Sequence, residues 1–276
     1  MNFGVNKEKM DMMPFRTYGQ KPYTIAVIHG GPGAGGEMAP VARQLSSEWG
    51  VIEPIQTKKS IEKQIQELKS TITKNCSSSL ILVGYSWGAW LSLLFAVQHK
   101  SDVKKIILIS SGPFEEKYVD QLRTTRTNRL SKEERAEFET IITKLNTENL
   151  YQNDAEFKRL GELGSKTDNF NPMKKEVEDE IQVKDSSEIY QLVWGEAAKL
   201  RKNGQLLELT KSITCPVTAI QGDYDPHPYE GVEVPLSRTL RNFKFHLIKK
   251  CGHTPWLENE AYKEFYQILN DEIENV

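Results

Sequence analysis

A serine flanked by two glycines is the first candidate for chemistry in this sequence of 276 residues. Gly84 and Gly88 each lie two positions from Ser86, and the apolar run 80–83 comes directly before them. This spacing predicts a strand that turns sharply into a helix and exposes the serine hydroxyl at the turn. Glycine suits both positions because a side chain there would collide with the neighbouring strand or helix. The motif indicates a nucleophile, and a serine that only caps the following helix is the alternative.

A glycine-rich loop, residues 29–33 with the sequence HGGPG, follows the apolar run 23–28. Ligands of open parallel sheets bind where the strands end, and bare backbone N–H groups of such a loop can approach a reacting oxygen. A phosphate-binding loop is the alternative. It is disfavoured because no Gly-Lys-Ser/Thr ending follows, and Glu37 stands where a dinucleotide fingerprint needs a small residue. The pattern therefore favours an oxyanion loop.

An acid and a base follow two further apolar runs. Asp223 and Asp225 come after the run 217–220, and His253 comes after the run 243–248. An alcohol attacks at neutral pH only when a base takes its proton, and a carboxylate can orient that base. The order serine, acid, histidine is typical of one family of catalytic sheets.

These motifs, taken in order, resemble the α/β-hydrolase superfamily over nearly the whole chain, and the HGGPG loop with the Ser-Trp-Gly elbow resembles its proline iminopeptidase branch. The resemblance implies that Ser86 is the nucleophile and His253 the general base and then acid. It implies that Asp225 is the orienting carboxylate, because the family's acid falls three residues after the loop glycine. The backbone N–H groups of Gly31 and Trp87 would form the oxyanion hole.

The acid and the base each have an alternative candidate. Asp223 competes with Asp225 for the acid, although its place in the loop is typical of a turn residue. His227, between two prolines just beyond Asp225, competes with His253 for the base.

The alternation of short apolar runs with helical patterns predicts an α/β fold with a doubly wound, mostly parallel sheet. Helices are expected over residues 38–48 and 60–74. Only about two dozen residues precede the first run, so the family's usual antiparallel first strands must be shortened or missing. The expected strands are residues 23–28, 51–55, 80–83, 106–109, 217–220 and 243–248, the last toward the sheet edge.

The alternation stops over residues 115–212, which are charged and periodic at helical spacing. Ser131 and Glu134 form a capping box that opens one helix. Another apolar face runs from Ile189 to Leu200, with Gly204 as its stop. We expect a helical lid here, inserted into a sheet core made of residues 1–114 and 213–276.

The resemblance to proline iminopeptidases implies lid carboxylates that hold the amino terminus of a substrate. Glu188 and Glu196 lie near Trp194 in the expected lid, although most such acids belong to solvated helix faces. Tryptophans could wall an apolar pocket, with core packing as the alternative. The pocket candidates are His29, Trp194, Glu196 and Trp256.

Composition narrows the possible partners. A net charge of −2 gives no attraction to nucleic acid or to an anionic membrane. No apolar stretch is long enough to span a membrane, and the first residues do not resemble a secretion signal. Three cysteines far apart predict free thiols in the cytoplasm. The histidines lack metal-ligand spacing, so no metal and no organic cofactor are expected.

We therefore predict a serine hydrolase that cleaves a small ester or amide through an acyl-enzyme intermediate. The substrate would be a small molecule or a short peptide. An aminopeptidase of the proline iminopeptidase type is one alternative, and a non-catalytic receptor for a small ligand on the same fold is another. The sequence does not indicate an oligomeric state.

Overall fold

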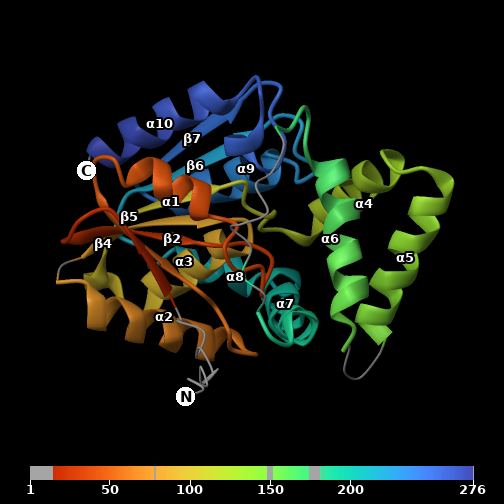
Figure 1. Ribbon diagram of the computed structural model, residues 1–276, viewed down its shortest axis with the longest axis horizontal. Coiled ribbons are helices and arrows are strands. Elements are labelled where there is room, and N and C mark those ends of the chain that lie inside the picture. The colour runs from red at the N-terminus through yellow and green to blue at the C-terminus, as the bar shows by residue number, and fades with distance from the viewer. Residues whose placement is uncertain (1–14, 78, 148–151, 174–180, 182, 276) are drawn as a thin grey trace, which may run out of the picture.

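The computed structural model describes residues 15–77, 79–147, 152–173, 181 and 183–275. Its centre is a seven-stranded sheet in the order β1-β3-β2-β4-β5-β6-β7 (Figure 1). β1 runs antiparallel to β3, and every other neighbouring pair is parallel. The strands are β1 (Phe15–Tyr18), β2 (Tyr23–Ile28), β3 (Gly50–Pro54), β4 (Leu80–Tyr85), β5 (Val103–Ile109), β6 (Val217–Gly222) and β7 (Phe243–Ile248).

The predicted α/β fold with a mostly parallel, doubly wound sheet is confirmed. All six expected strands are present, and β7 lies at an edge, as its more alternating pattern indicated. β1 is the strand that the sequence did not reveal; it is the shortened antiparallel start, only four residues long. Its half-buried pattern explains why no apolar run marked it.

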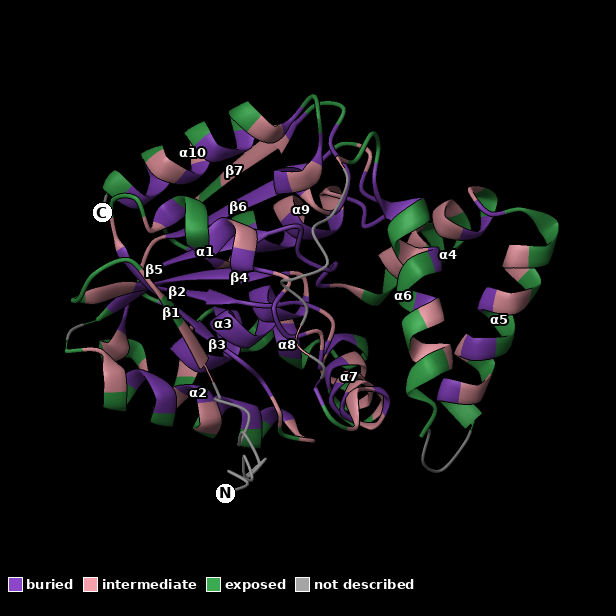
Figure 2. Ribbon diagram, viewed as in Figure 1, coloured by how far each residue is buried: buried purple, intermediate pink, exposed green. Residues whose placement is uncertain are grey.

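Helices cover both faces of the sheet (Figures 1 and 2). Successive strand side chains point to opposite faces. Val27 and Val83 therefore pack under α1 (Ala39–Leu45) and α10 (Tyr262–Glu274). Ile28 and Leu82 face the other layer, which comprises α2 (Ile61–Asn75), α3 (Trp87–Gln98), α8 (Gln205–Thr210) and α9 (Glu230–Thr239).

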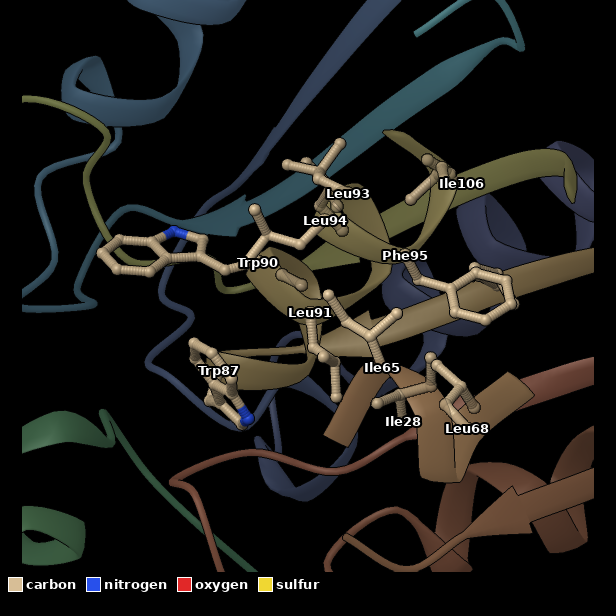
Figure 3. Packing of buried hydrophobic residues seen from close by; sticks show 14 of the residues in the cluster. Ile28, Ile65, Leu68, Trp87, Trp90, Leu91, Leu93, Leu94, Phe95 and Ile106 are labelled. Carbon is tan, nitrogen blue, oxygen red and sulfur yellow. The ribbon is translucent and has the colours of Figure 1, made fainter. Parts of the chain in front are cut away.

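The helix α3 is the most deeply buried of these, and its apolar residues run all round it. Figure 3 shows Leu91 and Phe95 on the side of Ile65 and Leu68 from α2, whereas Trp90 points another way. A helix that is apolar on every side must be buried. Its N-terminus is therefore fixed where β4 ends.

Between β5 and β6 lies an inserted set of helices. Ser131 and Glu134 form the predicted capping box: each backbone N–H donates to the other's side chain, at 3.0 and 3.2 Å. The helices are α4 (Val119–Asn128), α5 (Lys132–Thr147), α6 (Asp154–Asp168), α7 (Ser186–Lys202) and α8, preceded by a 3-10 turn at Glu116–Tyr118. Further 3-10 turns lie outside the insertion, at Lys100–Asp102 and Pro255–Leu257.

The inserted helices fall into two groups. α4 to α6 project to one side of the molecule around a small apolar cluster of their own, which includes Phe138 and Leu163 (Figure 1). α7 instead packs its Ile189, Val193 and Ala197 face into the main core, as the apolar periodicity predicted. The predicted helical insertion is thus present, while its role as a lid and its division from the core as a separate domain stay predictions.

Candidate active site

Ser86 lies at the turn between β4 and α3. Its φ of +52° is a conformation that residues other than glycine rarely adopt, and its N–H donates to the Ile109 oxygen at 2.9 Å. A Cβ on Gly88 would collide with the carbonyl oxygens of Ile28 and His29, and one on Gly84 would collide with the carbonyl of Gly88. The two glycines therefore allow the close packing that the elbow needs.

The HGGPG loop lies against this elbow. A Cβ on Gly30 would come within 2.9 Å of the Tyr85 ring, and Gly31 has a φ of +26°. His29 is fully buried and uses both ring nitrogens: Nε2 accepts from the Gln56 N–H at 3.1 Å, and Nδ1 lies 3.0 Å from the Gly30 oxygen. Burial lowers the pKa of His29 to about 4. His29 is therefore neutral and holds the loop in place.

The predicted acid and base meet beside the elbow. His253 Nδ1 lies 2.7 Å from Asp225 Oδ2, and the His253 ring centroid is 5.0 Å from that of Tyr85, the residue before Ser86. Asp223, the rival acid, is exposed and lies near the Lys249 ammonium at 3.6 Å. Of the two acids, Asp225 is the one that the structure pairs with His253.

The charges of this pair are coupled. Burial alone would raise the pKa of Asp225, but His253 and then His227 outweigh burial and hold that pKa well below its usual range. Burial alone would lower the pKa of His253, but the Asp225 carboxylate, with a smaller contribution from Asp168, raises it. Asp225 is thus ionised at neutral pH, and its charge favours a proton on His253.

The rival base, His227, also contacts Asp225. Its Nδ1 lies 2.7 Å from Asp225 Oδ1. Ligand atoms of Asp225, His227 and His253 lie within 4.8 Å of one another, which is the spacing of a metal site. Both imidazole Nδ1 atoms already lie at hydrogen-bond distance from the carboxylate, so a metal would have to displace those protons. The arrangement is that of a hydrogen-bonded cluster.

Two residues of the inserted helices support His253, the predicted base, and sequence reasoning missed both. The backbone oxygen of Asp168 accepts the His253 N–H at 2.8 Å. The Asp168 carboxylate is buried and is held by the Arg126 guanidinium, whose Nε lies 2.9 Å away. The charged, helical pattern around these residues gave no sign of this role, because it matches a solvated helix face.

The proposed oxyanion donors lie at the elbow and in the HGGPG loop. The Trp87 N–H opens α3, so no carbonyl within the helix accepts from it. The Trp87 indole donates to the Gln64 side chain at 3.0 Å. Gly31 follows Gly30, the loop residue that lies against the Tyr85 ring. The role of the Gly31 and Trp87 N–H groups as oxyanion donors stays a prediction.

The pocket candidates have different surroundings. Trp194 stacks on Trp90 with ring centroids 5.4 Å apart, so it joins α7 to α3 beyond the elbow. Glu196 is an exposed residue whose carboxylate accepts the Ile61 N–H at 2.8 Å. Trp256 is buried and packs edge-on against Tyr85 at 4.7 Å. Their contact with a substrate stays a prediction.

Comparison with known proteins fits this geometry. The family model for the alpha/beta hydrolase fold matches residues 73–260, which span the elbow, the acid and the base. The chain belongs to the alpha/beta hydrolase family. A proline iminopeptidase from Heyndrickxia coagulans is 24% identical over 273 residues, with 91% of each chain covered.

Solved structures show the same fold. A proline iminopeptidase from Mycobacterium smegmatis matches with a TM-score of 0.66 at 15% identity, covering 95% of this chain and 94% of the other. A candidate lipase from Acinetobacter baumannii AYE matches with a TM-score of 0.67 at 21% identity, covering 95% and 88%. An esterase from Thermogutta terrifontis has a TM-score of 0.61 at 17% identity, covering 95% and 92%.

Within the described ranges, no helix combines the length and apolarity that a membrane span requires. The three cysteines are free thiols, as their spacing predicted.

Proposed function

We propose that the protein is a serine hydrolase that cleaves a small ester or amide through an acyl-enzyme intermediate on Ser86. The observation that carries the proposal is the 2.7 Å contact between Asp225 and His253 beside an elbow with a serine at φ +52°. A strained, half-buried serine next to an oriented imidazole is an arrangement suited to nucleophilic catalysis.

The chemistry follows from the donors and acceptors present. Asp225 accepts the Nδ1 proton of His253, so His253 Nε2 is free to take the Ser86 proton as Oγ attacks the substrate carbonyl. The backbone N–H groups of Gly31 and Trp87 stabilise the oxyanion. His253 then gives the proton to the departing alcohol or amine. Water attacks the acyl-enzyme by the same route, and Ser86 recovers its proton.

A fluorophosphonate probe tests the nucleophile. We expect the wild-type protein to be labelled and to hydrolyse p-nitrophenyl acetate, whereas Ser86→Ala loses both. Ser110→Ala is the matched control, because Ser110 also follows a strand with a positive φ of 47° but is fully buried. Unchanged labelling in Ser86→Ala would contradict the proposal.

An aminopeptidase activity is the second candidate, supported by the proline iminopeptidase that matches 91% of this chain. The acids considered for a substrate amine are already engaged: Glu188 lies 2.8 Å from the Lys59 ammonium, and Glu196 caps the first N–H of α2. We therefore rank the small ester or amide first. Hydrolysis of proline p-nitroanilide at a rate above that of p-nitrophenyl acetate would reverse the ranking.

A non-catalytic receptor is the alternative from another class. Every part of the proposed machinery is present in the sequence, which favours an enzyme. Saturable binding of a small molecule by a protein that neither reacts with the probe nor turns over any ester would support the receptor instead.

A further inference from the structure

One carboxylate, that of Asp225, is shared by two imidazoles. His253 Nδ1 contacts Oδ2, and His227 Nδ1 contacts Oδ1, each at 2.7 Å. The backbone N–H of His227 also donates to Oδ1, at 2.9 Å. The two rings stack with centroids 4.5 Å apart and planes inclined by 22°. All three residues are buried, so each contact is made away from bulk water.

The protonation of His227 follows from these contacts. An ionised carboxylate only accepts hydrogen bonds, so the His227 nitrogen that faces it carries the proton. Burial lowers the pKa of His227, although Asp225 opposes that effect. A second positive charge stacked on His253 would be repelled, and Arg126 adds to that repulsion. His227 is therefore a neutral donor to Asp225.

We propose that His227 is a positioning residue, which fixes the Asp225 carboxylate through a neutral N–H donor and supports the His253 ring by stacking. The inference rests on the proposed function of the Ser86, Asp225 and His253 set. This role accounts for the two prolines that flank His227. They restrict the backbone that brings its N–H and its ring to the same carboxylate oxygen.

A consequence for pH dependence follows. A neutral donor on Oδ1 withdraws negative charge from the side of Asp225 that faces His253. The other groups facing His253 are Asp168 and Arg126 from the inserted helices and Tyr85 from β4, and they stay unchanged when His227 is replaced. Loss of the His227 donor should thus raise the pKa of His253 and shift the acid limb of kcat/KM to higher pH.

Two substitutions separate the donor from the ring. His227→Phe keeps a stacking ring and removes the N–H, whereas His227→Asn keeps an N–H near the same place and removes the ring. We expect the acid limb of kcat/KM for p-nitrophenyl acetate to move up by about 0.5 to 1 pH unit in His227→Phe. In His227→Asn it should stay within about 0.2 pH unit of wild type. His99→Phe is the control, since His99 lies at the far end of α3.

Coincident profiles for wild type and His227→Phe would overturn the proposal, and so would an equal shift in His227→Asn. Complete loss of fluorophosphonate labelling in both variants would instead make His227 the base. Nitrogen-15 NMR of the wild-type protein gives a readout independent of folding in the variants: His227 should carry its proton on Nδ1 at neutral pH. A protonated Nε2 with bare Nδ1 would contradict the inference.

An NMR titration of the histidines separates this inference from the proposed function. If the wild-type protein lacks labelling and turnover, the proposed function fails. The pKa of the His253 imidazole can still be followed by NMR in wild type and His227→Phe, and an unchanged value there counts against the role of His227 alone.

Discussion

Ser86 adopts a backbone conformation that costs about 1–3 kcal/mol for a residue with a side chain. The structure offsets that cost locally: the Ser86 N–H bonds to the end of β5, and Gly84 and Gly88 allow strand and helix to meet closely. These contacts hold the serine at the turn between β4 and α3. At the scale of the residue, the conformation of Ser86 therefore depends on its two glycine neighbours.

Replacement of one of these glycines tests that dependence. We expect Gly88→Ala to lower the free energy of unfolding by about 2–4 kcal/mol, because the added methyl group would overlap the carbonyls of Ile28 and His29. Gly195 is a matched control: it lies inside α7, and a Cβ added there would meet no atom within 4 Å. Gly195→Ala should raise the free energy of unfolding by about 0.5–1 kcal/mol. Urea denaturation measures both, and equal destabilisation would contradict this account.

At the scale of elements, the end of α6 is bound to the loop that carries His253. The buried Glu258 carboxylate accepts three backbone N–H groups: those of Gly252 at 2.8 Å, Phe170 at 2.7 Å and Asn171 at 2.7 Å. A carboxylate that accepts several N–H groups is a strong acceptor. Glu258 thus joins the inserted helices to the residue that precedes His253.

We expect Glu258→Gln to lower the free energy of unfolding by about 1.5–3 kcal/mol, because the amide NH₂ group faces a backbone donor. We also expect it to reduce kcat/KM, since Gly252 and His253 are adjacent. Glu260→Gln is the control: the exposed Glu260 carboxylate accepts from the Asn171 side chain at 2.9 Å, and its loss should cost less than about 0.5 kcal/mol. Thermal unfolding of both variants measures the two losses of stability. Similar melting temperatures for the two variants would refute the role of Glu258.

At the scale of the molecule, one buried carboxylate joins the last helix to three strands. Glu272 of α10 lies 2.7 Å from the Lys105 ammonium of β5 and accepts from Thr218 of β6 at 2.8 Å. Lys244 and His246 of β7 each lie 3.3 Å from its other oxygen. A buried charge is tolerated only when it is paired and hydrogen-bonded, and here both conditions hold.

The acid stability of the protein should reflect this carboxylate. Burial alone would raise the pKa of Glu272, but hydrogen bonds from Lys105 and Thr218 lower it to about 2. A lowered pKa in the folded state means that the contribution is present above the unfolded pKa of about 4.3 and is lost as pH falls toward 2.

Urea unfolding at a series of pH values measures this loss. Wild type should lose more stability between about pH 4.5 and pH 2 than Glu272→Gln, which has no proton to gain. Glu274→Gln, on an exposed position of the same helix, should follow wild type. Parallel curves for wild type and Glu272→Gln would show that Glu272 contributes nothing to the acid transition.

The sequence indicated Ser86, Asp225 and His253 because each follows an apolar run that forms a strand, and parallel strands end at the same edge of the sheet. It did not indicate Arg126 or Asp168. Their contact with the loop that carries His253 depends on how the inserted helices dock. A pattern of charges on a helix does not distinguish a buried ion pair from a solvated face. The sequence did not predict β1 either, because a short, half-buried edge strand has no apolar run.

The hydrogen bond from the His253 N–H to the Asp168 carbonyl makes the position of the predicted base depend on the inserted helices. A change in how α6 docks would therefore alter the setting of the imidazole without any substitution in the loop that carries it. Sequence variation among the inserted helices can thus tune a site whose three proposed residues all lie on the sheet core.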